Sequence, residues 1–142
     1  MVGSEAEVRA VIDDWANALR AKDAGGVVAR QATGFVQFAL APPLQATSLD
    51  RDGLSAWFSS WQGPIDYEIR DQRITAGERV AFCHSLNRMS ATTTDGQRTE
   101  LWFRQTLCFC KVGGEWKITH EHDSVPFYMD EDARAAIDLE PE

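Results

Sequence analysis

Cysteine and histidine are scarce in this chain, whose 142 residues include only three of each. An odd number of cysteines without framework spacing does not indicate a set of disulfides, and it favours a reducing cytoplasm. The acidic residues that follow the initiator are unlike a signal peptide, which needs a basic start and an apolar run. A run of about 20 apolar residues, which a membrane span requires, is also missing. We therefore expect a cytoplasmic protein that does not enter a membrane.

Basic residues are also in short supply, because 14 Lys and Arg stand against 22 Asp and Glu, for a net charge of −8. This balance repels phosphate backbones, and the sequence has no basic cluster to offset it, so nucleic acid is excluded as a partner. The tail over residues 130–142 holds six acidic residues and one arginine. We expect this tail to be a solvated end or a short helix around residues 133–137, and we assign it no chemistry.

The composition, with 44% hydrophobic and 25% charged residues, is typical of one soluble globular domain spanning residues 1–142. Ser4 and Glu7 predict a capping box at the start of an amphipathic helix that reaches Gly25 and Gly26. A short helix over residues 27–31, a small strand over residues 35–38 and a loop over residues 44–49 follow. Asp50 is expected to cap a third helix, whose apolar face is formed by Leu54, Trp57, Phe58 and Trp61.

Long extended runs with turn signals between them fill the rest of the chain. They predict four antiparallel strands, over residues 65–75, 79–93, 98–112 and 115–127. Helices gathered in the first half and strands in the second are typical of an α+β domain. We expect a curved sheet that wraps the long first helix.

Two stretches carry a family resemblance: VAFCHSLNRMS at residues 80–90 and ELWFRQTLCFCKVGGEWKITHEHDSVPF at residues 100–127. With the order of elements, they make residues 5–128 resemble the SnoaL-like branch of the nuclear transport factor 2-like superfamily. The segment from Trp116 to Pro126 also resembles the association domain of calcium/calmodulin-dependent protein kinases. The resemblance implies a cone-shaped α+β barrel with an apolar cavity, a core over residues 5–128 ahead of an acidic tail over 129–142, and a homodimer formed through the outer sheet face.

The activity does not follow from the fold, which hosts isomerases, cyclases, dehydratases and assembly domains. Ketosteroid isomerases of this superfamily use a carboxylate base at the end of the first strand and a tyrosine on the first helix. Residues 35–40 contain no acid, and the first helix contains no tyrosine. Two hypotheses remain: cofactor-independent acid–base chemistry on a small hydrophobic or cyclic molecule, and a non-catalytic binding or assembly domain.

Alternation along the strands assigns candidate residues to the cavity or to the outer face. The bulkier set of the strand over 79–93 is predicted to face the cavity: Val80, Phe82, His84, Leu86 and Arg88. The apolar set of the strand over 98–112 is predicted to do the same: Leu101, Phe103, Gln105, Leu107 and Phe109.

The last strand has two registers, depending on the turn at Gly113 and Gly114. A two-residue turn would pair Leu107 with His120. The side chains inside would then be Trp116, Ile118, His120, His122 and Ser124. A three-residue turn with a bulge would pair Leu107 with Thr119 and place Glu121 and Asp123 inside. The kinase association domain, in which the position matching Asp123 lines the cavity, favours the second. The outer face would then hold Trp102, Arg104, Thr106, Trp116, Ile118, His120 and His122.

Proton transfer is assigned to His84 with Glu121 or Asp123, because a buried histidine beside a carboxylate can act as acid or base. The alternative for His84 is a core histidine satisfied by the backbone. Arg88 could bind a carboxylate or enolate oxygen, or form a salt bridge to Asp71 or Asp123.

A flat or cyclic ligand is expected because aromatic side chains are plentiful, although they could simply fill the core. The residues assigned to ligand binding are Phe38, Trp57, Trp61, Tyr67, Phe82, Arg88, Phe103 and Gln105. His120 and His122 would hold a metal only with a third ligand, and Cys108 and Cys110 lack a second cysteine pair. Phosphate-binding loops and dinucleotide fingerprints are missing, so we expect neither metal nor cofactor.

Overall fold

The computed structural model describes residues 3–47 and 49–142; Ser48, in the predicted loop over 44–49, lies outside the described residues. Three helices occur in this part of the chain: α1 (Ser4–Arg20), α2 (Ala24–Val28) and α3 (Arg51–Ser59). The strands are β1 (Gln31–Phe38), β2 (Trp61–Ala76), β3 (Val80–Thr93), β4 (Arg98–Val112) and β5 (Glu115–Ser124). No helix among these residues is long and apolar enough to cross a membrane.

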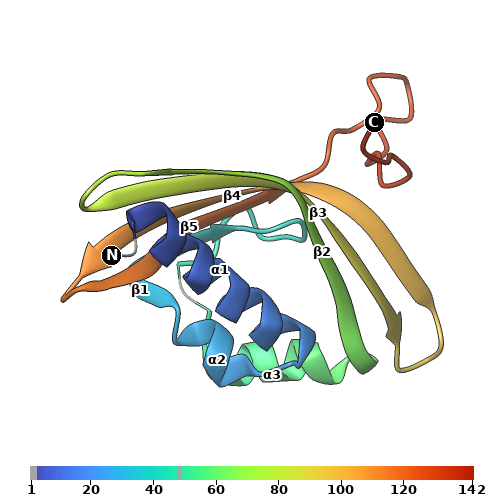
Figure 1. Cartoon of the computed structure of the whole chain (residues 1–142). Coiled ribbons are helices and arrows are strands. Elements are labelled where there is room, and N and C mark those ends of the chain that lie inside the picture. The colour runs from blue at the N-terminus through green and yellow to red at the C-terminus, as the bar shows by residue number, and fades with distance from the viewer. Residues whose placement is uncertain (1–2, 48) are drawn as a thin grey trace.

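The strands form one sheet in the order β1-β5-β4-β3-β2, so β1 and β2 are its edges. The strands from β2 to β5 are joined as an antiparallel meander, and β1 adds to β5 in parallel. The sheet curves over the helices, which all lie on its concave side (Figure 1). The predicted α+β architecture, a curved sheet around the first helix, is confirmed.

Helix α1 supplies the side of the core that faces the sheet. Its buried side chains recur at helical spacing, at Val8, Ile12, Trp15 and Leu19. They join one apolar cluster with sheet residues such as Leu107, which is 1% exposed. The Arg20 guanidinium donates to the backbone carbonyl of Tyr67 at 3.0 and 2.8 Å, which fastens the end of α1 to β2.

The helix boundaries differ from the predictions where capping decides them. The capping box is wrong, because Gly3 is the N-cap and Ser4 already lies in the first turn. Helix α1 ends at Arg20 rather than at the glycines, because the Asp23 carboxylate accepts from the N–H of Gly26 at 3.0 Å and starts α2 there.

The third helix has the predicted cap but is shorter than predicted. Asp50 accepts from the N–H of Gly53 at 2.5 Å, as expected of an N-cap residue. The helix ends at Ser59, and Trp61 is the first residue of β2. The ring centroids of Trp57 and Trp61 are 5.8 Å apart, so the two indoles still meet across this junction.

Neither predicted pairing for the last strand is correct. Val112 pairs with Glu115, so the turn has two residues, yet Leu107 pairs with Glu121. The register shifts between Cys108 and Phe109, where Thr119 is the extra residue of a bulge in β5.

The bulge gives both parts of β5 the same buried face. Trp116 and Ile118 are buried before it, 4% and 1% exposed, and Glu121 is buried after it, at 6%. The prediction that Glu121 faces the interior is therefore confirmed. The placement of Trp116 and Ile118 on the outer face is wrong, because the bulge lies within the strand and not at its turn.

The predicted face of β3 is reversed. The buried side chains are Ala81, Cys83, Ser85 and Asn87, whereas Val80, Phe82, His84, Leu86 and Arg88 lie on the convex face. Ranking by bulk failed because the convex face carries large apolar groups of its own: Phe82 is 48% exposed. The predicted face of β4 is correct, with Phe103, Gln105, Leu107 and Phe109 buried.

The C-terminal tail folds back on itself and is neither frayed nor helical. Phe127 forms an isolated bridge with Ala135, and the N–H of Ala136 donates to the carbonyl of Pro126 at 2.8 Å. Ala136 is 3% exposed. The tail borders a hollow of about 160 Å³ on the convex face, beside Leu86 and Trp102.

Replacing Leu107 by Ala should lower the free energy of unfolding by about 2–5 kcal/mol, because it opens a cavity under α1. Urea denaturation followed by far-ultraviolet circular dichroism measures the loss. Val80→Ala is the control on a neighbouring strand, since Val80 is 67% exposed and should cost under about 1 kcal/mol. Equal losses in both variants would contradict this account of the core.

Candidate functional site: a polar network on the concave face

A row of polar side chains crosses the concave face of the sheet, on which the other buried side chains are mostly apolar. Every strand contributes to it. Its members are Gln37 of β1, Glu121 and Asp123 of β5, Gln105 of β4, Ser85 and Asn87 of β3, and Tyr67 of β2. Buried polar groups of this kind are costly unless they are paired, so their contacts define what the site can do.

Asn87, which is fully buried, is at the centre of the network. Its amide nitrogen donates to the Tyr67 hydroxyl at 2.6 Å and to Gln105 Oε1 at 3.0 Å, and its Oδ1 accepts from the Ser85 hydroxyl at 2.6 Å. Gln105 Nε2 also lies 3.4 Å from the Tyr67 oxygen. Because that oxygen accepts from two amides, the hydroxyl hydrogen of Tyr67 is left to donate elsewhere.

Two carboxyl groups continue the network toward β1. Gln105 Nε2 donates to Asp123 Oδ1 at 3.0 Å, and Gln37 Nε2 donates to Glu121 Oε2 at 3.2 Å. Burial first, then the neighbouring charge of Glu121 and its hydrogen bond, raise the pKa of Asp123 well above its ordinary value. Asp123 is therefore held in its protonated form over a wider pH range than an ordinary aspartate.

The phenol of Tyr67 is kept neutral by the same surroundings. Burial, and then the charge of Asp123, raise its pKa well above the usual value near 10. A neutral phenol is a hydrogen-bond donor of the kind that stabilises negative charge on a substrate oxygen, and a carboxyl group with a raised pKa beside it can exchange protons.

Aromatic and apolar groups surround these donors. The rings of Trp15 and Phe103 meet the ring of Tyr67 edge-on, with centroids 5.8 and 6.1 Å away. Met89 and Leu101 are paired neighbours on the same face, one step along β3 and β4 from the network, and both are half-buried. The concave face thus offers a few polar atoms in an otherwise apolar setting, as small-molecule sites do.

A model of the SnoaL-like domain matches residues 8–128 of the chain. The chain belongs to the SnoaL-like family. A nuclear transport factor 2-like protein of unknown function from Pseudomonas putida KT2440 is 30% identical to this SnoaL-like protein. The match covers 97% of this chain and 96% of that one, with a TM-score of 0.82. The predicted family is therefore confirmed.

Two further solved structures share the fold of this SnoaL-like protein. A candidate calcium/calmodulin-dependent protein kinase II association domain from Xanthomonas campestris is 20% identical, covering 87% of this chain and 88% of that one, with a TM-score of 0.71. A ketosteroid isomerase-like protein from Erwinia carotovora is 19% identical, covering 87% and 97%, with a TM-score of 0.70. Comparison with curated proteins gave no match.

His84 does not join the polar network of this SnoaL-like protein. It pairs with Arg73 on β2 and Thr106 on β4, on the convex face of the sheet, where it is exposed. The backbone of the sheet therefore separates its imidazole from the carboxyl groups of Glu121 and Asp123. The predicted pair of His84 with Glu121 or Asp123 is therefore wrong, because it assumed that His84 lies on the concave face of the sheet.

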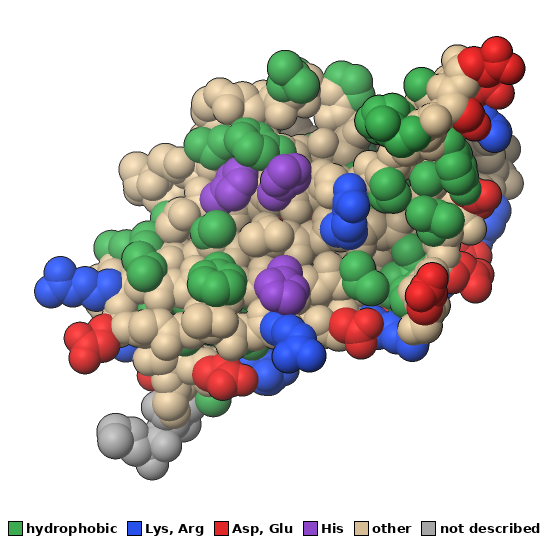
Figure 2. Space-filling model, turned by 90° about the horizontal axis from the view of Figure 1, so that it is seen from above, with side chains coloured by type: hydrophobic (Ala, Val, Ile, Leu, Met, Phe, Trp, Pro, Cys, Tyr) green, Lys and Arg blue, Asp and Glu red, His purple; other side chains and the backbone are tan. Residues whose placement is uncertain are grey.

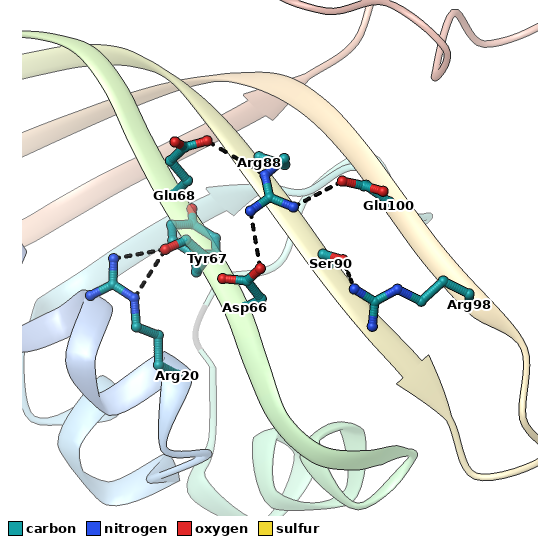
Figure 3. Close-up of polar contacts among 8 residues, drawn as sticks. All are labelled: Arg20, Asp66, Tyr67, Glu68, Arg88, Ser90, Arg98 and Glu100. Atoms are coloured by element: carbon teal, nitrogen blue, oxygen red, sulfur yellow. Dashed lines mark hydrogen bonds and ion pairs between the residues drawn. The ribbon is translucent and has the colours of Figure 1, made fainter.

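Arg88 also lies on the convex face, and it contacts three carboxylates there (Figure 3). Its guanidinium pairs with Asp66 at 3.0 Å, Glu68 at 3.4 Å and Glu100 at 2.9 Å. These pairs, from β2 and β4, replace the predicted partners Asp71 and Asp123. The exposed cluster spans three strands, and its hydrogen bonds are a charge-compensating arrangement on the surface of the sheet.

The other residues assigned to ligand binding divide between the two faces. Tyr67, Phe103 and Gln105 lie on the concave face, as predicted. Phe82 is on the convex face, and Phe38 packs there against His120 and His122, with ring centroids at 4.7 and 5.2 Å. Trp57 is 40% exposed on α3, and Trp61 is half-buried beside it.

Gln37, Ser85 and Asn87 are the network residues that were not predicted from the sequence. Ser85 and Asn87 alternate with the bulkier His84, Leu86 and Arg88, so they were assigned to the exposed face. The correctly predicted face of β4 could have located Ser85 and Asn87, because Ser85 pairs directly with Gln105 and lies on the same side of the sheet. Within the described residues, no group of three or more His, Cys, Asp or Glu side chains could hold a metal ion.

The raised pKa of Asp123 makes the stability of the protein depend on pH. A group whose pKa is higher in the folded state stabilises that state below its unfolded pKa of about 3.9, and the benefit is lost as pH rises through the folded pKa. The stability of wild type relative to Asp123→Asn should therefore fall with rising pH, by at most about 1.4 kcal/mol per pH unit.

Urea titrations from pH 4 to 9 test this dependence. Asp13→Asn is the matched control, because Asp13 is exposed on α1 and should leave the wild-type profile unchanged. Parallel profiles for wild type and Asp123→Asn would show that Asp123 titrates normally.

Proposed function

We propose that this SnoaL-like protein binds a small apolar or cyclic organic molecule on its concave face and moves a proton on it without a cofactor. The observation that carries the proposal is the place of Asp123 in the polar network, where it is hydrogen-bonded to Gln105 and has a raised pKa. Asp123 is partly accessible, whereas Asn87 behind it is fully buried. A partly accessible carboxyl group with a raised pKa can exchange a proton with a bound molecule.

The roles follow from the hydrogen bonds. In its ionised form Asp123 takes an α-hydrogen from the substrate as a proton and later returns a proton to the same carbon, and the 3.0 Å bond from Gln105 holds Oδ1 of Asp123 in place. Tyr67 donates its free O–H to a carbonyl or enolate oxygen, since its lone pairs are occupied by Asn87 and Gln105. Burial and the charge of Glu121 raise the pKa of Asp123, which makes its carboxylate a stronger base than that of an ordinary aspartate.

The substrate class follows from the lining. The available donors can satisfy one or two oxygens, and the neighbouring groups are the aromatic rings of Trp15 and Phe103 and the half-buried Met89 and Leu101. A cyclic ketone, enone or phenol has this balance of apolar area and oxygen atoms. A ketosteroid isomerase-like protein of the same fold supports this class, although the carboxylate and tyrosine of that chemistry are missing from their expected places here.

Asp123→Asn should slow enzyme-dependent exchange of α-hydrogens for deuterium in cyclic ketones by about 10²- to 10⁴-fold, the usual contribution of a general acid or base. The probes are 1-tetralone and cyclohex-2-enone in deuterated buffer, followed by proton NMR. Tyr67→Phe should also slow the exchange, because the oxyanion loses one donor.

Asp13→Asn and His84→Ala serve as controls and should exchange at the wild-type rate. A large loss in His84→Ala would return the catalytic role to the convex face. If wild type does not accelerate exchange beyond buffer with either probe, a non-catalytic role is favoured.

A second candidate function, assembly of a homodimer through the convex sheet face, is favoured by exposed apolar groups there. Val80 is 67% and Phe82 48% exposed, and the neighbouring Trp102 is half-buried. Figure 2 shows hydrophobic and histidine side chains gathered on this face, with acidic side chains toward its rim. An apolar surface with a charged rim is typical of an interface.

Phe82→Asp should shift the protein from dimer to monomer in size-exclusion chromatography with light scattering at micromolar concentration. A buried carboxylate at the centre of an apolar interface is unpaired and costs several kcal/mol, roughly. Leu44→Asp is the control, because Leu44 is 96% exposed on the loop between β1 and α3. A monomeric wild type would rule out this assembly.

We also propose the cytoplasm as the compartment of the protein. Cys83, Cys108 and Cys110 are all free thiols. Free thiols persist in reducing compartments, whereas oxidising ones convert them to disulfides or higher oxidation states.

A further inference from the structure

The C-terminal tail, residues 129–142, lies on the same side of the sheet as the convex face, which is the candidate dimer interface. Figure 1 shows the tail rising above the sheet, on the side opposite to the helices. Leu139 and Glu140 of the tail border a hollow beside Leu86 and Trp102 of the convex face. A second copy that packs against this face therefore meets the tail as well as the strands.

The tail is an ordered segment that nevertheless exposes large apolar side chains. Its backbone is held by hydrogen bonds of its own: the N–H of Tyr128 donates to the carbonyl of Arg134 at 2.8 Å, and the Tyr128 hydroxyl donates to Asp138. Met129 and Ile137 are exposed all the same. An ordered segment with exposed apolar side chains is typical of a surface that packs against a partner.

The convex face carries an arginine patch, formed by Arg70, Arg73 and Arg104, which the strand pairing places on this face. All three side chains are exposed, and none forms an ion pair with a carboxylate in the part of the chain that the structure describes. Asp71, at the bulge of β2, offsets one of their charges, and the carboxylates of the neighbouring cluster are paired with Arg88 instead. The patch therefore keeps a positive surplus in a protein whose net charge is −8.

We propose that the tail of each protomer docks on the convex face of a second copy, with its carboxylates on the arginine patch of that copy. The inference rests on the homodimer proposed above. Charge complementarity favours a second copy as the occupant, because residues 130–142 hold six acidic residues and one arginine.

The contact is assigned between copies because the chain's own tail leaves the patch unpaired. Glu140 and Arg104 border the same hollow, yet the ion pairs among the described residues do not join them. In a two-fold dimer the contact between tail and patch is made twice, so any change to it acts twice on the affinity.

Two charge-reversed variants test whether the contact joins two copies. The face variant carries Arg73→Glu and Arg104→Glu, and the tail variant carries Glu131→Lys and Glu140→Lys; all four side chains are exposed. Each variant alone should raise the dimer dissociation constant in sedimentation equilibrium at least about ten-fold, because like charges then face each other across the interface.

An equimolar mixture of the two variants should form heterodimers about as tight as the wild-type dimer. Each tail then meets a face of opposite charge, at both copies of the contact. Native mass spectrometry identifies the heterodimer by its mass. Recovery on mixing also shows that neither variant is misfolded.

Asp13→Lys is the matched control, because Asp13 is exposed on α1, on the other side of the sheet, and it should dimerise like wild type. Unchanged dissociation constants in both variants would overturn the tail contact and leave the dimer standing. Mixtures as weak as the separate variants would overturn it too, since the tail would then act within its own chain. A monomeric wild type would overturn the dimer itself, and the tail contact with it.

Discussion

The one-residue bulge at Thr119 is the constraint on which the interior depends. Without it, strict alternation along β5 would place either the apolar pair Trp116 and Ile118 or the acidic pair Glu121 and Asp123 on the concave face. The extra residue puts both pairs there, at different positions along the strand. One part of β5 can then pack under α1 while the other supplies the carboxyl groups of the polar network. The apolar core and the polar site thus occupy different parts of one strand. Exchanging the two sets of side chains would destabilise both parts.

Much of the fold could be predicted from the sequence, because hydrophobic periodicity and turn motifs are local signals. The α+β class, the Asp50 cap, all four long strands and the buried face of β4 follow from such signals. Local signals could not show which face of a strand is buried when both faces carry bulky side chains. On β3, Phe82 and Leu86 outweigh Ala81 and Cys83, yet the smaller residues face the helix. The error over His84 is a consequence of that face. Gln105 was placed inside because its face of β4 is the more apolar one, and Asp123 was placed inside by the resemblance to the kinase association domain.

The convex face and the tail are connected in a way that the charge distribution did not suggest. The acidic tail holds most of the net charge, and it was expected to be solvated. In the structure its backbone turns back through the pairing of Phe127 with Ala135 and comes to lie beside Leu86 and Trp102. The apolar residues Met129 and Ile137 remain exposed on it, at 86% and 55%. The tail therefore lies against part of the convex face of the sheet, and it carries exposed apolar side chains as well as carboxylates.

The hydrogen bonds of Asn87 also bear on how such a protein can change its specificity. Its amide serves Tyr67, Gln105 and Ser85 at once, so replacing any one member leaves a buried donor or acceptor of another unmet. Single substitutions in this group are then penalised even when the new side chain would suit a new ligand. Divergence toward another substrate proceeds through paired changes across adjacent strands. Combinatorial libraries that vary positions 67, 87 and 105 together would reach such variants, whereas stepwise selection would stall between them.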